Sequence, residues 1–155
     1  MVIGAKPSTY TLDEFAAELD ESARLADELP IARDLQDEIT ELIYASVQRN
    51  FDEQVGSNGA KWAPHAPLTV QLYGVHPLLI LTGTMWVAAT MSGVQGNYLE
   101  VSDRQIVTGV DLPYAAQQQF GTDRIPQREF YYVRDSYVYE IENLAAAYAV
   151  QEVLG

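Results

Sequence analysis

The sequence contains no cysteine, few basic residues and no long apolar run. The absence of cysteine excludes disulfide bonds, thiol catalysis and cysteine-based zinc sites. The longest strongly apolar stretch, Pro77 to Leu81, is far too short to cross a bilayer. Residues 1–11 lack the basic start and apolar run of a signal peptide. We therefore expect no membrane contact and a protein that stays in the cytoplasm where it is made.

The charge is strongly acidic, with 22 Asp and Glu against 9 Lys and Arg and a net charge of −13. Residues 1–54 carry thirteen acidic and four basic residues, giving −9, and residues 55–155 carry nine and five, giving −4. Phosphate binding requires clustered Lys and Arg, so a nucleic-acid groove is not expected. Two explanations of the acidity stay open: it keeps the protein soluble, or it repels DNA.

Motifs that carry catalysis are also missing. The sequence has no Gly-x-Ser-x-Gly element and no phosphate-binding glycine loop, and His65 and His76 do not have the spacing of metal ligands. The carboxylates lie mostly at solvent-facing helical positions, and no pair stands out as acid and base. We therefore expect no catalytic residue, no metal, no cofactor and no enzyme activity.

Helical spacing dominates the first third of the chain. Residues 1–10 are expected to form a flexible arm, and Thr11 and Glu14 have the capping-box spacing that begins a helix over residues 11–28. A second helix is predicted over residues 31–51. Its apolar rows are Leu35, Ile39, Leu42, Ile43, Val47 and Phe51.

The remainder of the chain mixes strand and helix patterns. Glycine and proline punctuate residues 52–77, which are expected to form one long loop. Residues 85–91 fit either a strand or a short helix. The other expected elements are a hairpin of strands 97–102 and 105–110, a short helix over 113–120 ending at Gly121, a strand over 129–133, and a helix from Asp135 or Ser136 to about Val153.

This order predicts the fold class α+β. We expect a single domain over residues 1–155, in which an antiparallel sheet is flanked by N-terminal helices and a C-terminal helix. Residues Ile141, Leu144, Ala145 and Tyr148 would form the apolar face of the last helix.

Aromatic residues are abundant, with ten Tyr, four Phe and two Trp. Four tyrosines occur within the nine positions from 131 to 139. They would either fill one core layer or form a subunit interface, where an aromatic body with a polar tip is favoured. The interface is the preferred interpretation, because one small domain can rarely bury so many rings.

Four short motifs follow one another in the central half of the chain. They are NGAKWAP at 58–64 with PLT at 67–69, HPLLILTGTM at 76–85, PYAAQQQFG at 113–121, and IPQREF at 125–130. In this order the motifs resemble those of the phage virion morphogenesis, or tail-completion, family. The resemblance runs from Phe51 to about Tyr131.

The resemblance implies a structural role in a phage particle. The chain would be a subunit of a six-fold ring at the head–tail junction, which caps the tail tube, joins it to the neck and lets DNA pass through without specific binding. Its partners would be copies of itself, the tail tube protein and neck or connector proteins, and its locations the virion and, during assembly, the host cytoplasm. Two alternatives stay open: a stopper-like neck or connector protein on the portal side, and a soluble acidic adaptor or inhibitor.

Two patches are expected to contact neighbouring subunits: the loop around Trp62 and the tyrosine-rich segment. Arg128 is a further candidate, to pair with an acidic helix of the same or an adjacent subunit. The full set of candidate interface residues is Trp62, Pro64, Leu81, Thr82, Gly83, Tyr114, Phe120, Arg128, Phe130, Tyr131, Tyr132, Tyr137 and Tyr139. The candidates for facing the DNA channel, where like charge prevents adhesion, are Asp34, Asp37, Glu38 and Glu41.

Overall fold

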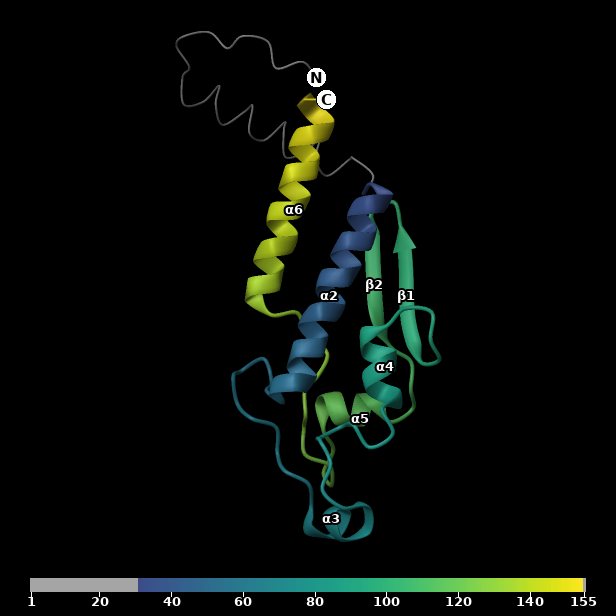
Figure 1. The fold of residues 1–155 in the computed structure, drawn as a ribbon, viewed down its shortest axis with the longest axis vertical. Helices are drawn as coiled ribbons and strands as arrows, with labels where there is room; N and C mark the ends of the chain where they lie inside the picture. The colour runs from purple at the N-terminus through teal and green to yellow at the C-terminus, as the bar shows by residue number, and fades with distance from the viewer. Residues whose placement is uncertain (1–30, 155) are drawn as a thin grey trace.

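The computed structural model describes residues 31–154, so the expected arm at 1–10 and the expected helix at 11–28 lie outside the described residues. The chain is ordered as helices α2 (Arg33–Glu53), α3 (Pro67–Tyr73) and α4 (Thr84–Thr90), strands β1 (Asn97–Ser102) and β2 (Gln105–Val110), and helices α5 (Ala115–Phe120) and α6 (Asp135–Leu154) (Figure 1).

The α+β class is confirmed, since the helices accompany an antiparallel sheet of two strands. Helix α2 is central: the hairpin and α4 pack along one side of it, and α6 packs along the other (Figure 1). The C-terminal helix therefore covers α2 and not the sheet. Helix α3 lies at one end of the molecule, opposite the first turn of α2 and the last turns of α6 (Figure 1).

The predicted second helix is confirmed as α2, which begins and ends two residues later than expected. Its buried face includes Leu35, Val47 and Phe51, as the apolar spacing predicted. Polar residues share that face, among them Ser46 and Asn50, which are fully buried. Such side chains are stable in a core only when they form hydrogen bonds, and both do so with a later segment of the chain.

The predicted hairpin is also confirmed, with its strands paired from Asn97 opposite Val110 to Ser102 opposite Gln105. At its turn, the Asp103 carbonyl accepts a hydrogen bond of 2.6 Å from the N–H of Ile31. At its base, the Asn97 amide donates to the Ala88 carbonyl at 2.9 Å. The hairpin thus lies along α2, and its turn lies beside the start of this helix.

Two other expectations concerning secondary structure are settled by the structure. Residues 52–77 are not one continuous loop, because Pro67 begins helix α3 and Gly74, with φ 74°, follows its end. Proline at the first helical position and glycine just after the last are preferred there. Residues 85–91 were open between strand and helix, and they lie in or directly after α4.

The predicted strand over residues 129–133 is wrong. These residues are extended but pair with no strand in the described part of the chain. Side-chain amides take the place of a neighbouring strand. The Gln119 Oε1 atom accepts from the N–H groups of Phe130 and Tyr131, and the Asn50 Nδ2 atom donates to the carbonyls of Phe130 and Tyr132.

The hydrophobic core lies at the C-terminal end of α2. The ring of Phe51 packs edge-on against Trp62, with ring centres 5.8 Å apart, and lies 5.5 Å from the ring of Phe130. The other buried members of this cluster are Val47, Leu78, Met85, Ala89 and Ala115. Every helix except α3 and α6 contributes to it, which fixes the short elements around the end of α2.

Helix α6 is less buried than helix α2. The face predicted for it is confirmed, because Ile141, Leu144, Ala145 and Tyr148 are half-buried, and the Tyr148 hydroxyl donates to Glu38 on α2 at 3.0 Å. Within the described residues, no helix is both long and apolar enough to span a membrane.

Candidate functional site

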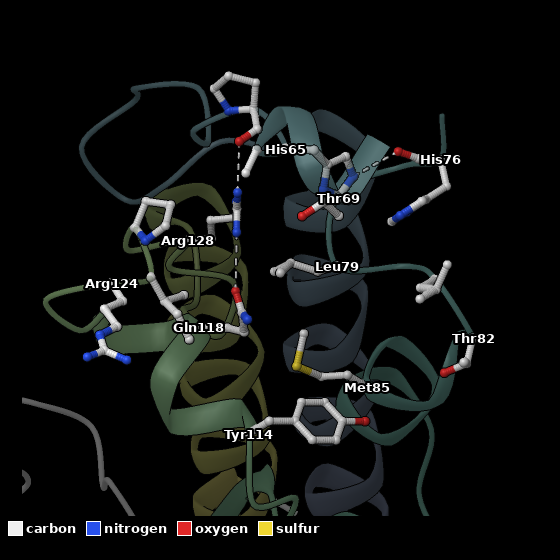
Figure 2. A pocket seen from close by; sticks show the side chains of 15 residues that line it. His65, Thr69, His76, Leu79, Thr82, Met85, Tyr114, Gln118, Arg124 and Arg128 are labelled. Carbon is white, nitrogen blue, oxygen red and sulfur yellow. Dashed lines mark hydrogen bonds between the residues drawn. The ribbon is translucent and has the colours of Figure 1, made fainter. Parts of the chain in front are cut away.

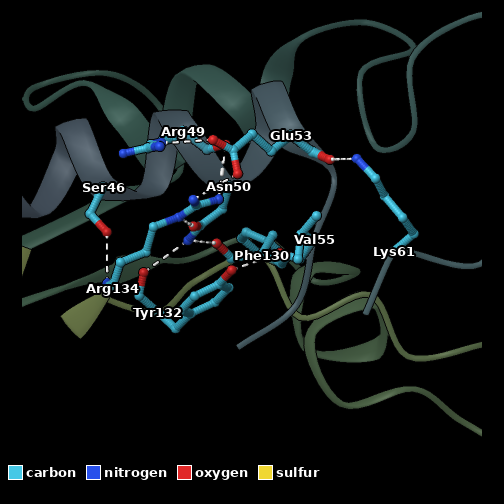
Figure 3. Close-up of polar contacts among 9 residues, drawn as sticks. All are labelled: Ser46, Arg49, Asn50, Glu53, Val55, Lys61, Phe130, Tyr132 and Arg134. Carbon is cyan, nitrogen blue, oxygen red and sulfur yellow. Dashed lines mark hydrogen bonds and ion pairs between the residues drawn. The ribbon is translucent and has the colours of Figure 1, made fainter. Parts of the chain in front are cut away.

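A polar network fastens the tyrosine-rich segment to α2 (Figure 3). Arg134 donates from Nε to Asn50 Oδ1 at 2.8 Å and pairs with the Glu53 carboxylate at 2.8 Å. Arg49 reaches the same carboxylate at 2.7 Å. The Tyr132 hydroxyl donates to the Val55 carbonyl at 2.7 Å. Bonds from Arg49 and Arg134 hold the pKa of Glu53 at about 2, below its usual value of 4.5.

Arg128 supports the loop that follows Trp62. Its guanidinium donates to the carbonyls of Ala63 at 2.8 Å and Pro64 at 2.9 Å. The residue is 8% exposed, and burial lowers its pKa. Among the described residues, its side-chain donors reach only main-chain carbonyls and, at 3.4 Å, the Gln118 side chain, so the expected pairing with an acidic helix of the same or an adjacent subunit stays a prediction. Arg128 holds the loop on α5.

Beside Arg128 lies a pocket of about 650 Å³, enclosed by α3, α5, the first turn of α4 and the segment before Arg128 (Figure 2). Its wall combines apolar side chains with Arg124 and Arg128, and none of the described lining residues carries a carboxylate. The lining residues are Pro64, His65, Ala66, Thr69, His76, Leu79, Leu81, Thr82, Met85, Tyr114, Gln118, Arg124, Ile125, Pro126 and Arg128.

Two glycines shape the borders of this pocket. Gly83 has φ 78° and directly precedes α4, and Gly121 has φ 72° and follows α5. A side chain at Gly121 would also come within 2.8 Å of the main-chain nitrogen of Gln127. Gly121 therefore lets the chain turn sharply and return beside α5, where Arg128 N–H donates to the Gln118 carbonyl.

The two histidines meet at the pocket, although their spacing in the sequence is not that of metal ligands. Their ring centres are 4.2 Å apart, and the Nε2 atom of His65 lies 3.1 Å from the His76 carbonyl (Figure 2). Across residues 31–154, no group of three or more His, Asp or Glu side chains is arranged to hold a metal ion. The histidine pair therefore packs the base of α3 against the following loop.

Helix α3 leaves its apolar side chains uncovered. None of its residues is buried, and Leu68 and Leu72 are each 64% exposed. Tyr73 and Val75, at its end, are 60% and 92% exposed. We call Leu68, Val70, Leu72, Tyr73 and Val75 the α3 tip. Several exposed apolar residues close together in the chain mark a site of protein contact more often than isolated exposed residues do.

Charge is separated along the molecule. Residues 54–99, which include the α3 tip and part of the pocket, contain no Asp or Glu and one Lys, in a chain of net charge −13. In contrast, Asp34, Asp37, Glu38 and Glu41 are all exposed on α2. The apolar end is thus close to neutral, and the acidic surface lies along the helices.

The structure distributes the candidate interface residues over three environments. Pro64, Leu81, Thr82, Tyr114 and Arg128 come together around the pocket, with Gly83 next to them. Trp62 and Phe130 are core residues, and the Trp62 ring donates to the Glu129 carbonyl at 3.0 Å. These two side chains therefore offer a neighbour no free surface.

The tyrosines have mixed positions. Tyr131, Tyr132 and Tyr137 are half-buried, and burial raises the pKa of Tyr131 to about 12. Tyr139 is 66% exposed, and Phe120, on α5, is 74% exposed. Part of the segment therefore packs on α2, and Tyr139 stays at the surface, where its role in a subunit interface remains a prediction.

Two features of the structure were not predicted from the sequence: the α3 tip, and the side-chain amides of Asn50 and Gln119 that hold the tyrosine segment. A proline followed by Leu, Val, Leu and Tyr up to Gly74 is a recognisable signal for a short helix. Asn50 falls on the buried row of α2 four residues after Ser46, and a polar residue on an apolar row indicates a buried hydrogen bond. No local signal marks Gln119, whose side chain forms hydrogen bonds with Phe130 and Tyr131, eleven and twelve residues later.

Comparison with protein-family models, curated proteins and solved structures gives no match to this chain.

Proposed function

We propose that the chain is a structural subunit of a phage tail-completion ring at the head–tail junction. In this role, copies of the chain form a ring of six subunits that caps the tail tube and presents a surface to the neck proteins. DNA passes through the ring without specific binding. The resemblance of the four motifs between residues 58 and 130 supports the proposal, and the exposed surfaces described above are consistent with assembly.

The observation that carries the proposal is the uncovered α3 tip. A helix with two leucines that are each 64% exposed loses the stabilisation of burial in an isolated chain. A partner that covers these side chains restores it. The core cluster around Phe51, Trp62 and Phe130 contains no residue of the α3 tip. These features favour a subunit of an assembly over a protein that works alone.

The acidic face of α2 supports the second part of the proposal. Asp34, Asp37, Glu38 and Glu41 have exposed side chains on one helix. In a ring with α2 directed inward, these carboxylates would face the DNA phosphates and repel them. A neutral or basic lumen in the assembled particle would contradict this arrangement.

Two other functions fit the uncovered tip. A stopper-like neck protein would use it on the portal side of the junction, and a soluble acidic adaptor or inhibitor would use it to bind a protein outside the particle. The described residues that line the pocket include no Asp or Glu, so they supply no pair of carboxylates for acid–base catalysis.

Cryo-electron microscopy of virions that encode the chain tests the proposal, with side-chain density used to locate it. A ring of this chain between tail tube and neck is the expected result. A ring on the portal side would favour the neck protein, and a particle that lacks the chain would overturn the virion role and favour the adaptor.

Complementation of a phage that lacks the chain provides a second test. The Leu72→Asp variant should fold but leave unjoined heads and tails, because a carboxylate at the α3 tip prevents its burial in a contact. The matched control is Val150→Asp on α6, where the native side chain is 55% exposed. Equal numbers of joined particles with the two folded variants would argue against a joining role for the tip.

A further inference from the structure

Helix α5 carries an exposed aromatic side chain on the side that faces away from the pocket. Phe120 is 74% exposed, whereas Phe51 and Phe130 are fully buried. Tyr114 and Gln118 both line the pocket and mark the side of α5 that faces it (Figure 2). Phe120 follows Gln118 by two residues, a turn of about 200° around a helix, and is not among the described lining residues. The Phe120 ring therefore points away from the pocket of its own chain.

The pocket can accept an apolar side chain from outside. Leu79, Leu81 and Met85 line it, and Leu81 is 53% exposed and so within reach of a partner. The Arg128 guanidinium is already bonded to the carbonyls of Ala63 and Pro64, so it requires no anionic ligand. A cavity of about 150 Å³ holds benzene, so this pocket of about 650 Å³ has room for a phenyl ring and the side chains beside it.

Charge favours a second copy of this chain as the partner. The net charge is −13, so two copies repel one another where their acidic surfaces meet. Residues 62–99, which supply most of the pocket wall, contain no Asp, Glu, Lys or Arg. The same is true of residues 112–122, which include α5 and the Phe120 ring. Contact between the ring and the pocket thus joins two uncharged surfaces and keeps the acidic ones apart.

We propose that the Phe120 ring of one copy of this chain enters the pocket of a second copy. The ring packs there against Leu81 and Met85, and its burial stabilises the contact. Aromatic side chains that fill a pocket commonly contribute much of the binding energy of an interface. This inference rests on the proposed function, because it names the contact that joins the ring subunits.

The contact is heterologous, since one side of α5 supplies the Phe120 ring and the opposite side borders the pocket. Every dimer keeps one unused ring and one unused pocket, so copies add until a closed ring forms or a filament grows. No residue of the α3 tip is among the described lining residues. The tip therefore remains available for a different partner, such as the tail tube protein.

Disulfide crosslinking tests the proposal directly, because the native sequence has no cysteine to interfere. Full-length Phe120→Cys and Leu81→Cys chains, carrying different tags, are mixed and mildly oxidised. We expect a disulfide-linked dimer that contains both tags. The matched control replaces Leu81→Cys with Val150→Cys, a position of similar exposure on α6, and should give little product. Equal yields with the two positions, or linkage of Phe120→Cys only to itself, would overturn the proposal.

Two variants that each lose one half of the contact provide an independent test. Phe120→Asp removes the ring and keeps the pocket, while Leu81→Asp places a carboxylate in the pocket wall and keeps the ring. Each variant alone should self-associate at least about tenfold more weakly than the native chain, because a charged group replaces an apolar one at the contact. Mixed together, they should form a one-to-one dimer that grows no further, since one intact ring and one intact pocket remain.

Analytical ultracentrifugation measures these species, and circular dichroism verifies that each variant is folded. Val150→Asp changes the net charge by the same amount at an exposed position on α6 and should associate as the native chain does. A mixture that stays monomeric would overturn the proposal. Equal weakening by Val150→Asp would indicate a general effect of net charge and would contradict the specific contact.

The outcomes also separate this inference from the proposed function. A ring of this chain in virions, combined with no crosslink between Phe120→Cys and Leu81→Cys, keeps the tail-completion role and rejects the contact. Crosslinked oligomers in solution, combined with particles that lack the chain, keep the contact and reject the virion role.

Discussion

Apolar side chains are buried at the C-terminal end of α2 and exposed at the α3 tip. Around Phe51, aromatic rings pack edge to face and the buried amide of Asn50 satisfies main-chain carbonyls. At the tip, Leu68 and Leu72 are also strongly apolar, but each side chain remains 64% exposed. The difference indicates that the first region stabilises the isolated chain, while the second is available to a partner.

Truncation of one side chain in each region should give the largest contrast. Phe51→Ala removes a ring from the centre of the core and should reduce the free energy of unfolding by about 3–5 kcal/mol. Leu72→Ala should change it by less than about 0.5 kcal/mol, because the side chain is mostly solvated in the monomer. Urea denaturation monitored by tryptophan fluorescence measures both.

Similar losses from the two substitutions would show that the tip contributes to folding, and the comparison would then fail. Far-ultraviolet circular dichroism of Phe51→Ala at low temperature verifies that enough native protein is present for the transition to be fitted.

Replacing the buried amide of Asn50 should give the second-largest loss in the free energy of unfolding. Asn50→Leu keeps a side chain of similar size but removes the hydrogen bonds to the Phe130 and Tyr132 carbonyls and one of the partners of the Arg134 guanidinium. Unsatisfied buried groups cost about 1–3 kcal/mol each, so a total loss of at least about 2 kcal/mol is expected.

Gln48→Leu is the control for this change, since Gln48 is on the same helix and its amide donates only to the exposed Asp52. A stability change within about 0.5 kcal/mol is expected there. If Asn50→Leu changes the free energy of unfolding as little as Gln48→Leu does, the polar network does not hold the tyrosine segment.

A pair of glycines sharpens the comparison through the backbone. Gly121 and Gly74 both have φ near 73° and an extended ψ, but only Gly121 faces other atoms, with Gln127 N at 2.8 Å from an added Cβ. Gly121→Ala should therefore cost about 1–3 kcal/mol for the backbone conformation plus the steric contact, and Gly74→Ala the conformational part alone.

Thermal unfolding of the two alanine variants measures this difference. Equal shifts in Tm would mean that the segment after α5 moves away freely. In that case Gly121 would not be required for the close approach that brings Arg128 onto the loop.

The sequence predicted the elements with a repeating pattern, and it did not predict the segment that is held by individual side chains. The hairpin and α2 were predictable because their pairing and burial repeat along the chain, with alternation in the strands and helical rows in α2. The extended segment over 129–133 has the composition of a strand as well. Its hydrogen bonds go to Asn50 and Gln119 side chains, and no local pattern distinguishes these acceptors and donors from a second strand.

The candidate site was only partly predictable for a related reason. The four motifs pointed to Pro64, Leu81, Tyr114 and Arg128, which the fold gathers around one pocket. The sequence did not distinguish residues that build the loop from residues that stay at its surface. Trp62 illustrates this, because burial against Phe51 depends on a contact between the end of α2 and a loop eleven residues later.

The smallest expected effect concerns Glu53, at the solvent-exposed border of the core network. Its pKa of about 2 in the folded protein is below the usual 4.5, so the unfolded chain binds a proton first as the pH falls. The stabilisation by Glu53 is therefore fully present above pH 4.5 and lost between pH 4.5 and 2. Glu53→Gln should remove this part of the pH dependence of unfolding.

Solvent screening keeps the effect modest, because exposed ion pairs contribute little to stability. Arg134→Gln is the informative companion, since it removes one of the two guanidinium partners and should move the pKa of Glu53 back toward its usual value. Nuclear magnetic resonance of the Glu53 side-chain carboxyl follows that pKa directly. An unchanged pKa in Arg134→Gln would mean that Arg49 alone holds the carboxylate, and that the tyrosine segment is fastened to α2 by Asn50 and Ser46 without the ion pair.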